Sequence, residues 1–425
     1  MKQLIFTQSG CNIWQLYPFS LTRRLQDFRI GALTNREKWE RSLGLKSFDL
    51  KGESLLPDPG PVISWEELDG AAQVYLVRCD LLPSRELIAQ IKELKQGEAL
   101  VSEDEIPLVR FITKKYIDNN GKPAPAKRQI VAKDAARMEF APWLCSLNKN
   151  ALLFDIDLLV QHNDFSAIEQ SNGVSRPQDI FIEKGAVVRH CFINADEGPV
   201  YIAKDALVME GTCIRGPVFI GEKATVKMGA KIYGATTIGP HCVVGGEIKN
   251  SIFFANSNKA HDGYLGDSVI GEWCNLGAGT SCSNMKNNVG YIHHHLGDTM
   301  FMSGKKSGVV MGDFSRTAIN TSINTGTIVG VSAHVFGNEL TPKYIPAFSW
   351  GFESFREAEF PELSQFRVTD EPEKIIKKYK FATYDLEKAL RDADAWKQLK
   401  GAVLTASEKQ VLTDIYNKFN KHNKK

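Results

Sequence analysis

The chain has 425 residues, 43% of them hydrophobic and 24% charged, with a formal net charge of +2. This length exceeds one ordinary core, so we expect two or three domains, and the balanced charge disfavours nucleic acid or an anionic membrane surface as a partner. No apolar stretch reaches the roughly 18 residues of a membrane span. The eight cysteines are scattered without a Cys-x-x-Cys pair, and the first residues show no signal peptide, which favours free thiols in a cytoplasmic protein.

Positive charge gathers early in the chain, within residues 17–40 (YPFSLTRRLQDFRIGALTNREKWE). The basic side chains that could bind a polyphosphate there are Arg23, Arg29, Arg36 and Lys38. Arginine suits phosphate because its planar guanidinium makes paired hydrogen bonds. The alternative is a solvated basic face that binds nothing.

A strand followed by a helix is predicted next. Residues 74–77 (VYLV) form an apolar run, and the residues after Ser84 place apolar side chains on one helical face, with Ser84 as the N-cap. Asp80 would stand at the carboxyl end of the strand, where ligands bind in open α/β sheets. Residues 136–170 are also predicted to be helical, with a break at Pro142, and to connect this region to the rest of the chain.

An aliphatic residue then returns every six positions, a period of neither a helix nor an ordinary strand. The longest run is Ile202, Val208, Ile214, Ile220, Val226, Ile232, Ile238 and Val244. The pattern returns with a shifted phase at Met311, Thr317, Ile323, Val329 and Val335. Each hexad predicts one short strand and a tight corner, and three hexads predict one triangular coil of a parallel β-helix.

The repeat slips between Val244 and Tyr264 and is lost from Gly279 to Gly308, which predicts a polar excursion from the stack. Its three adjacent histidines, residues 293–295, cannot all hold one metal because neighbouring side chains of an extended segment alternate, and we predict a solvated loop there. After residue 355 we predict helices that cap the open end of the stack, the last one starting with a capping box at Thr405 and Glu408.

Residues 259–284 (KAHDGYLGDSVIGEWCNLGAGTSCSN) resemble the acetyltransferase half of the family of bifunctional N-acetylglucosamine-1-phosphate uridylyltransferase/glucosamine-1-phosphate acetyltransferase. The resemblance implies a left-handed β-helix, a homotrimer, and acetyl-CoA bound between neighbouring β-helices. It also implies that His261 is the general base, a role that suits imidazole because the ring ionises near neutral pH.

The same resemblance implies further site residues. Those near the sugar phosphate would be Lys231, Lys249, Tyr264 and Asn275, and those near acetyl-CoA would be Ala278 and Asn284. The alternative for His261 is a turn histidine that only hydrogen-bonds. The sequence departs from the family at Asp262, at Gly263 and after Asn284, which leaves open whether the acceptor is an amine or a hydroxyl.

The N-terminal half is similar to a sugar nucleotidylyltransferase-like family that is fused to hexapeptide β-helices. The similar segments are residues 17–40, residues 74–80 (VYLVRCD) and residues 344–351 (YIPAFSWG). This resemblance implies nucleotide binding at the basic stretch and makes Asp80 a candidate Mg²⁺ ligand. Residues 1–31 contain only Gly10 and Gly31, so the usual glycine-rich phosphate loop is not visible. Whether this domain still catalyses is left open.

We therefore expect a transferase with four parts: a nucleotidylyltransferase-like α/β domain over residues 1–150, a connecting segment over 151–180, a left-handed β-helix over 181–350 and a helical tail over 351–425. The expected activity is acetyl-CoA-dependent N-acetylation of an amino-sugar 1-phosphate such as glucosamine-1-phosphate, nucleotidyl transfer to a sugar 1-phosphate, or both, in nucleotide-sugar supply for the cell envelope. One alternative keeps only nucleotidyl transfer from UTP or dTTP, with the β-helix as a trimerising or regulatory scaffold. The other is a scaffold with both sites decayed.

Overall fold

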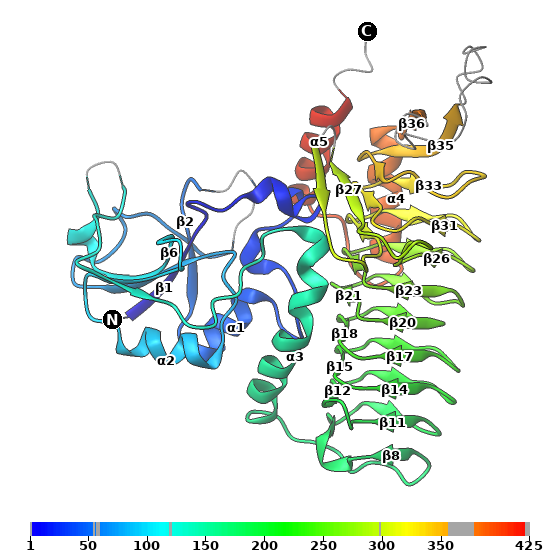
Figure 1. The fold of residues 1–425 in the computed structure, drawn as a ribbon, viewed down its shortest axis with the longest axis horizontal. Helices are drawn as coiled ribbons and strands as arrows, with labels where there is room; N and C mark the ends of the chain where they lie inside the picture. The colour runs from blue at the N-terminus through cyan, green and yellow to red at the C-terminus, as the bar shows by residue number, and fades with distance from the viewer. Residues whose placement is uncertain are drawn as a thin grey trace.

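The computed structural model describes residues 2–53, 56, 60–118, 121–296, 299–355 and 378–420. A mixed α/β domain lies beside a tall stack of short strands, and helix α3 (Leu144–Val160) runs between the two (Figure 1). No helix within these ranges is both long and apolar enough to cross a bilayer.

The N-terminal domain is built on a seven-stranded sheet of order β3-β2-β1-β4-β6-β5-β7. Strands β1 to β4 pair in parallel, whereas β6 is antiparallel to both of its neighbours. The strands are β1 (Lys2–Thr7), β2 (Ser47–Leu50), β3 (Val62–Ile63), β4 (Gln73–Arg78), β5 (Glu98–Val101), β6 (Pro107–Ile112) and β7 (Arg128–Val131). The helices are α1 (Asn35–Leu43) and α2 (Arg85–Glu93), with short 3-10 helices η1 (Ile13–Leu16), η2 (Phe19–Leu21), η3 (Leu25–Asp27), η4 (Lys114–Tyr116) and η5 (Ala141–Trp143) in the connections; η6 (Pro177–Asp179) lies in the first coil of the β-helix.

The predicted strand and helix around Asp80 are confirmed. Residues 74–77 are buried within β4, and Asp80 follows its carboxyl end. The Ser84 hydroxyl accepts a hydrogen bond from the backbone N–H of Leu87, which caps the start of α2, and the apolar face of that helix is buried. The α/β class of the domain therefore follows from periodicity alone.

The helix predicted over residues 136–170 is shorter than expected. Helix α3 covers Leu144–Val160, and Pro142 lies in η5 directly before it. In a first turn the missing N–H of proline costs no hydrogen bond, so Pro142 begins the helical segment instead of breaking it. Buried Asn148 then joins the domains, because its side chain accepts from the backbone N–H of Gly31 at 2.7 Å and donates to the carbonyl of Ala235 at 2.8 Å.

The second part is the predicted left-handed parallel β-helix, whose three faces are long parallel sheets. The first face contains β8 (Gly173–Ser175), β11 (Phe192–Asn194), β14 (Cys213–Arg215), β17 (Lys231–Tyr233), β20 (Glu247–Lys249) and β23 (Tyr264–Gly266). The second contains β9 (Ile180–Ile182), β12 (Val200–Ile202), β15 (Val218–Ile220), β18 (Thr236–Ile238), β21 (Ile252–Phe253), β24 (Val269–Ile270), β29 (Val310–Met311), β32 (Ile328–Val329) and β34 (Tyr344–Ile345).

The third face contains β10 (Val187–Val188), β13 (Leu207–Val208), β16 (Thr225–Val226), β19 (Val243–Val244), β22 (Asn258–Lys259), β25 (Asn275–Leu276), β30 (Arg316–Thr317), β33 (His334–Val335), β35 (Ser349–Phe355) and β36 (Lys378–Thr383). A further pair, β26 (Ser281–Cys282) and β31 (Ser322–Ile323), forms a separate two-stranded sheet that continues the column of the first face beyond β23 (Figure 1).

The period of six is explained by the register. Ile202 pairs with Ile220 and Ile220 with Ile238, so every third hexad falls on the same face and its side chain is buried inside the stack. The predicted change of spacing in the repeat after Val244 is also confirmed, because Val244 pairs with Lys259 in the next coil. Val269 pairs with Val310, so the entire excursion falls within one coil.

The excursion contains an antiparallel hairpin of β27 (His293–Leu296) and β28 (Thr299–Met302). The predicted solvated loop is therefore wrong for residues 293–295: they form a strand, and His294 is buried. The alternation argument itself holds, because only the middle histidine is buried. Within the described ranges, no group of three or more His, Cys, Asp or Glu side chains could hold a metal.

The C-terminal helices are α4 (Leu386–Gln398) and α5 (Ala406–Asn420), and Thr405 forms the predicted capping box with Glu408. They do not cap the open end. They pack along the flank, in a cluster with Trp273, Phe314 and Phe348 that spans several coils. The terminal position of the third face is taken by β36, which pairs antiparallel with β35. The prediction of a helix over residues 371–396 is wrong for residues 378–383, which form strand β36, and residues 371–377 lie outside the described residues.

Candidate functional site

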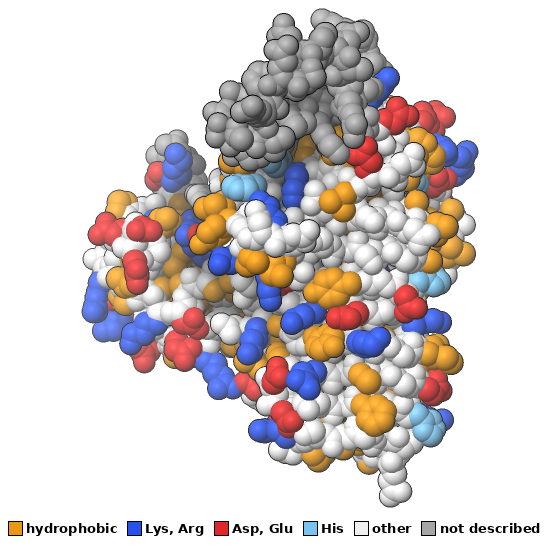
Figure 2. Space-filling view, turned by 45° about the vertical axis from the view of Figure 1, so that its right-hand side comes forward, with side chains coloured by type: hydrophobic (Ala, Val, Ile, Leu, Met, Phe, Trp, Pro, Cys, Tyr) orange, Lys and Arg blue, Asp and Glu red, His pale blue; other side chains and the backbone are white. Residues whose placement is uncertain are grey.

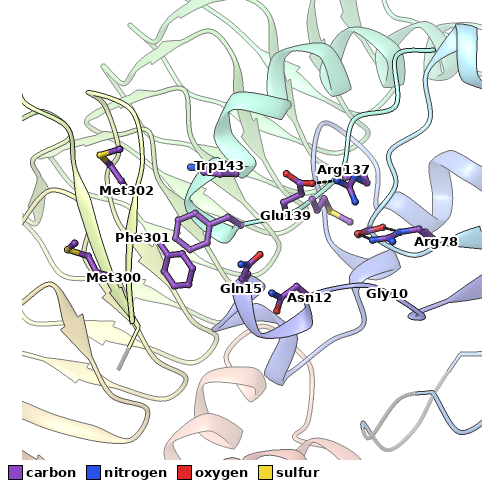
Figure 3. A pocket seen from close by; sticks show the side chains of 13 residues that line it. Gly10, Asn12, Gln15, Arg78, Arg137, Glu139, Trp143, Met300, Phe301 and Met302 are labelled. Carbon is purple, nitrogen blue, oxygen red and sulfur yellow. Dashed lines mark hydrogen bonds and ion pairs between the residues drawn. The ribbon is translucent and has the colours of Figure 1, made fainter. Parts of the chain in front are cut away.

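A cavity of about 520 Å³ opens at the carboxyl end of β4, and we call it the N-terminal pocket (Figure 3). Four segments line it: Gly10, Asn12 and Gln15 after β1; Arg78 and Asp80 after β4; Arg137 to Phe140 with Trp143 around η5; and Met300 to Met302 of β28. Cations, carboxylates, side-chain amides and aromatic rings therefore face one space, a combination that suits a phosphorylated organic ligand.

Each arginine of this pocket is paired with a carboxylate. Arg78 donates to both oxygens of Asp80, at 3.0 and 2.5 Å, and Arg137 donates to Glu139. Burial alone would lower the pKa of Arg78, but the hydrogen bonds and the charge of Asp80 outweigh burial and raise it. Arg78 therefore stays cationic, and Asp80 lies where the sequence predicted it, engaged by that cation.

The four residues predicted to bind nucleotide, Arg23, Arg29, Arg36 and Lys38, do not line this pocket. Arg23 pairs with Asp313 and Glu272 of the β-helix, Arg29 donates to the carbonyl of Ala32, and Arg36 pairs with Asp27 and Asp49. Lys38 is fully buried against Asp155 of α3, and burial lowers its pKa. Arg23 therefore joins the N-terminal domain to the β-helix and Lys38 joins α1 to α3, whereas Arg29 and Arg36 are engaged within the N-terminal domain. Because all four already have partners, we leave them out of the proposed nucleotide site.

The second candidate site is the turn from the third face to the first face at residues 260–263, which we call the His261 corner. His261 is exposed there. Gly263 has φ +126, and a Cβ on it would lie 2.1 Å from the carbonyl oxygen of Thr280 in the next coil, so only glycine fits. The departure from the family at this position thus follows from close stacking of two corners.

Beside the corner, the first face carries most of the predicted substrate residues. Lys231 and Tyr264 both pair with Glu247, on either side of it, so the three form one column. Lys249 stands in the adjacent column, with its ammonium 5.9 Å from the ring centre of Tyr233. Two cations and a phenol therefore share one outer surface next to an exposed imidazole.

Tyr264 and Asn284 are in direct contact. The Asn284 amide donates to the Tyr264 hydroxyl at 3.0 Å and to the Asp267 carboxylate at 2.5 Å. Burial, followed by the charge of Asp267, raises the pKa of Tyr264 to about 12, so its hydroxyl remains protonated at neutral pH. The structure thereby joins a predicted substrate residue to a predicted cofactor residue.

Asn275 and Ala278 lie elsewhere. Asn275 is on the third face, paired with Asn258 and Arg316, and Ala278 follows it at the next corner, where its carbonyl accepts from the backbone N–H of Asn320. The predicted set is therefore divided between two faces that meet at the His261 corner. A ligand that contacts all of these residues would have to extend across the edge between the first and third faces.

Lys259 is a residue that the sequence reasoning missed. Its side chain points into the β-helix, 1% exposed, and its ammonium donates to the carbonyls of Gly245 at 3.0 Å and His261 at 2.7 Å. It therefore clamps two successive corners. The sequence feature that could have indicated this role is the break in the six-residue repeat, which places Lys259 in register with Val244. Arg78, Arg137 and the hairpin residues were also missed, because only folding brings their segments together.

Lys259 yields a prediction about pH. Burial lowers its pKa from 10.5 to about 8, so the unfolded chain binds one more proton than the folded chain between those values. Stability must therefore rise with pH across that window, by up to about 3 kcal/mol. We expect the free energy of unfolding of the wild type, minus that of Lys259→Met, to become more positive from pH 8 to pH 10.5 in urea titrations. A difference independent of pH would contradict this.

Residues 4–164 match the family model described as sugar nucleotidyl transferase, so fold and sequence together define the class: a sugar nucleotidyl transferase-like domain followed by a left-handed β-helix. Among curated proteins the chain resembles the bifunctional protein GlmU of Methanococcus vannielii, with 34% identity over 107 residues. It also resembles the bifunctional sugar-1-phosphate nucleotidylyltransferase/acetyltransferase of Sulfurisphaera tokodaii, with 34% identity over 91 residues.

These matches are partial. They cover 25% and 21% of this chain, and the chain spans about a quarter of the length of each relative, 26% and 23%. Among solved structures, the UDP-N-acetylglucosamine acyltransferase of Arabidopsis is 15% identical, with 60% of this chain and 92% of that chain covered and a TM-score of 0.26.

Proposed function

We propose that the chain is a bifunctional transferase of nucleotide-sugar synthesis, with acetyl transfer at the His261 corner and nucleotidyl transfer in the N-terminal pocket. The observation that carries the first reaction is the exposed imidazole beside Lys231, Lys249 and Tyr264 on the first face. The second rests on the family match and on the paired arginines of the pocket. The name of the Sulfurisphaera tokodaii relative describes the same two activities.

At the His261 corner, an amino-sugar 1-phosphate would place its phosphate against the two lysines. The amine lone pair forms a C–N bond with the thioester carbon of acetyl-CoA, the C–S bond breaks, and coenzyme A leaves as the thiolate. The His261 imidazole accepts the proton that the amine loses and can return it to the thiolate. Asn284 and Ala278 would lie along the coenzyme, and Asn275 would contact the sugar across the edge.

A homotrimer belongs to this proposal. A groove of about 490 Å³ runs along the first face, lined by Phe192, Tyr233, Arg215 and Lys231 among others, and the Phe192 side chain is 63% exposed. Figure 2 shows apolar and charged side chains mixed on the flank of the β-helix. A neighbouring copy covering this face would enclose the acetyl-transfer site and shield the ring of Phe192.

In the N-terminal pocket, a phosphate oxygen of the sugar 1-phosphate would attack the α-phosphorus of a nucleoside triphosphate. A P–O bond forms, the P–O bond to pyrophosphate breaks, and Arg78 and Arg137 neutralise the phosphate charge. In place of the glycine-rich loop usual in such enzymes, which this sequence lacks, the segment after β1 makes a short turn at Gly10, whose φ is +75. Phosphate would compete with Asp80 and Glu139 for the two guanidinium groups.

Magnesium at Asp80 stays a prediction. Both Asp80 oxygens accept from Arg78, and in the part of the chain that the structure describes Asp80 belongs to no group of three or more acidic, histidine or cysteine side chains that could hold a metal. As arranged, these residues do not fit a protein-held ion, and neither reaction above takes a step through one.

The test is a mass-spectrometric product screen with acetyl-CoA, UTP and dTTP against several sugar 1-phosphates and amino-sugar 1-phosphates. Acetylated sugar phosphate and nucleotide sugar are both expected. Nucleotide sugar alone would leave the β-helix as a scaffold, and neither product, together with no thermal shift by any of these compounds, would favour a decayed scaffold.

Arg137→Gln tests the phosphate end of the pocket. Loss of a charge-assisted hydrogen bond costs about 1.5–3 kcal/mol, so we expect the KM for the nucleoside triphosphate to rise roughly ten- to hundredfold, with acetyl transfer unchanged. Arg85→Gln is the matched control, because Arg85 forms an exposed ion pair with Asp157 outside the pocket. Equal KM values for the two variants would remove Arg137 from the site.

A further inference from the structure

The hairpin of β27 and β28 leaves the β-helix and packs against the N-terminal domain. Phe301 of β28 lies 4.7 Å, centre to centre, from the ring of Phe140, and His294 of β27 meets the same ring edge-on at 5.7 Å. His294 and Ser303 share a hydrogen bond of 2.9 Å, and Leu296 is buried in the N-terminal core. These contacts fix the hairpin relative to the pocket.

The pocket has two chemically different ends. In Figure 3, Arg78, Arg137 and Glu139 lie at one end and the rings of Phe301 and Trp143 at the other, with the amides of Asn12 and Gln15 between them. The ring of Phe140 packs on that of Phe301 at the aromatic end. Phe301 is directed from the hairpin toward Gln15, whereas Met300 and Met302 lie on the opposite side of the strand. A ligand filling this space would carry phosphates at one end and a planar apolar group at the other.

We propose that the hairpin of the β-helix is the base-binding wall of the N-terminal pocket, with Phe301 in contact with the base of a nucleoside triphosphate whose phosphates lie at Arg78 and Arg137. This rests on the proposed nucleotidyl transfer and adds a residue to it from the other domain. Aromatic faces stack on any nucleobase, and the amides of Asn12 and Gln15 are placed to bond its polar edge.

The connection between the two sites is covalent and short. The excursion that carries the hairpin starts and ends beside Asn284, because the Ser307 backbone N–H donates to the Asn284 carbonyl at 2.9 Å and Gly308 donates to the Asp267 carbonyl at 2.8 Å. One segment of chain therefore contributes Asn284 to the proposed acetyl-transfer site and Phe301 to the proposed nucleotide site.

The experiment compares two probes on the full-length chain by calorimetric titration: nucleoside triphosphates (UTP and dTTP) and inorganic tripolyphosphate. Phe301→Leu keeps apolar packing on Phe140 but removes the aromatic face. We expect it to weaken binding of whichever nucleotide the wild type prefers by about five- to twentyfold and to leave tripolyphosphate binding unchanged. Phe336→Leu, which alters an aromatic residue of the β-helix away from the pocket, is the matched control and should change neither.

The outcomes separate the inference from the function beneath it. If Phe301→Leu binds nucleotide as the wild type does, or weakens the binding of both probes equally, the hairpin does not bind the base. The proposed nucleotidyl transfer would be unaffected by that result. A wild type that binds tripolyphosphate as tightly as either nucleotide would also overturn the base-binding wall. A wild type that binds neither probe would remove the nucleotide site itself. Retained tripolyphosphate binding shows that Phe301→Leu is folded.

Discussion

His261→Asn is expected to lower the rate of acetyl transfer by a factor of about 10²–10⁴, the range for loss of a positioned general base. The imidazole is exposed at its corner, so its removal opens no cavity and should leave the stability of the β-helix unchanged. Nucleotidyl transfer should be unaffected, because His261 does not line the N-terminal pocket. The measurement is coenzyme A release with glucosamine-1-phosphate as acceptor.

His190→Asn is the matched control, since His190 is an exposed histidine of a lower coil, remote from the lysines. Equal rates for the wild type and His261→Asn would remove His261 from the mechanism. A loss in both variants would point to the stability of the β-helix as the cause.

Asp155→Asn should destabilise the N-terminal domain by about 3–5 kcal/mol, the cost of leaving a buried charge without its partner. Lys38 and Asp155 are 1% and 0% exposed, and Asp155 also accepts from the backbone N–H of Leu33 at 2.9 Å. The amide keeps the shape and that hydrogen bond but leaves the ammonium of Lys38 uncompensated. Urea titration followed by tryptophan fluorescence, to which the neighbouring, fully buried Trp39 contributes, measures the change.

The double variant Lys38→Met/Asp155→Leu provides the second arm of this cycle. Because a buried ion pair can often be replaced by apolar side chains with little loss, it should recover most of the stability that Asp155→Asn loses. A single variant as stable as the wild type would show that Lys38 is not left as an uncompensated buried charge, and the ion pair would then contribute nothing to the stability of the α1–α3 contact.

The β-helix was predictable because its signal is local and repeated. A buried aliphatic residue at every sixth position leaves one solution, since each coil must place its apolar edge on the next. The capping residues Ser84 and Thr405 were predictable for a similar reason: their partners lie three positions along the chain. The helical tail was misplaced because amphipathic periodicity shows that a face is buried and does not show against which coils.

By itself, the sequence determined the stack of triangular coils, the α/β class of the first domain and the stretch around His261, all of which depend on neighbours within one or two coils or turns. Only the tertiary structure decided where the basic residues went. Lys38 and Arg23 looked like phosphate ligands, yet each met a carboxylate more than one hundred positions away, Asp155 or Asp313. The N-terminal pocket likewise draws on four separated segments, one of them a hairpin from the other domain. Such pairings depend on which residues are close in the folded chain, and the pattern of residue types along the sequence does not show this.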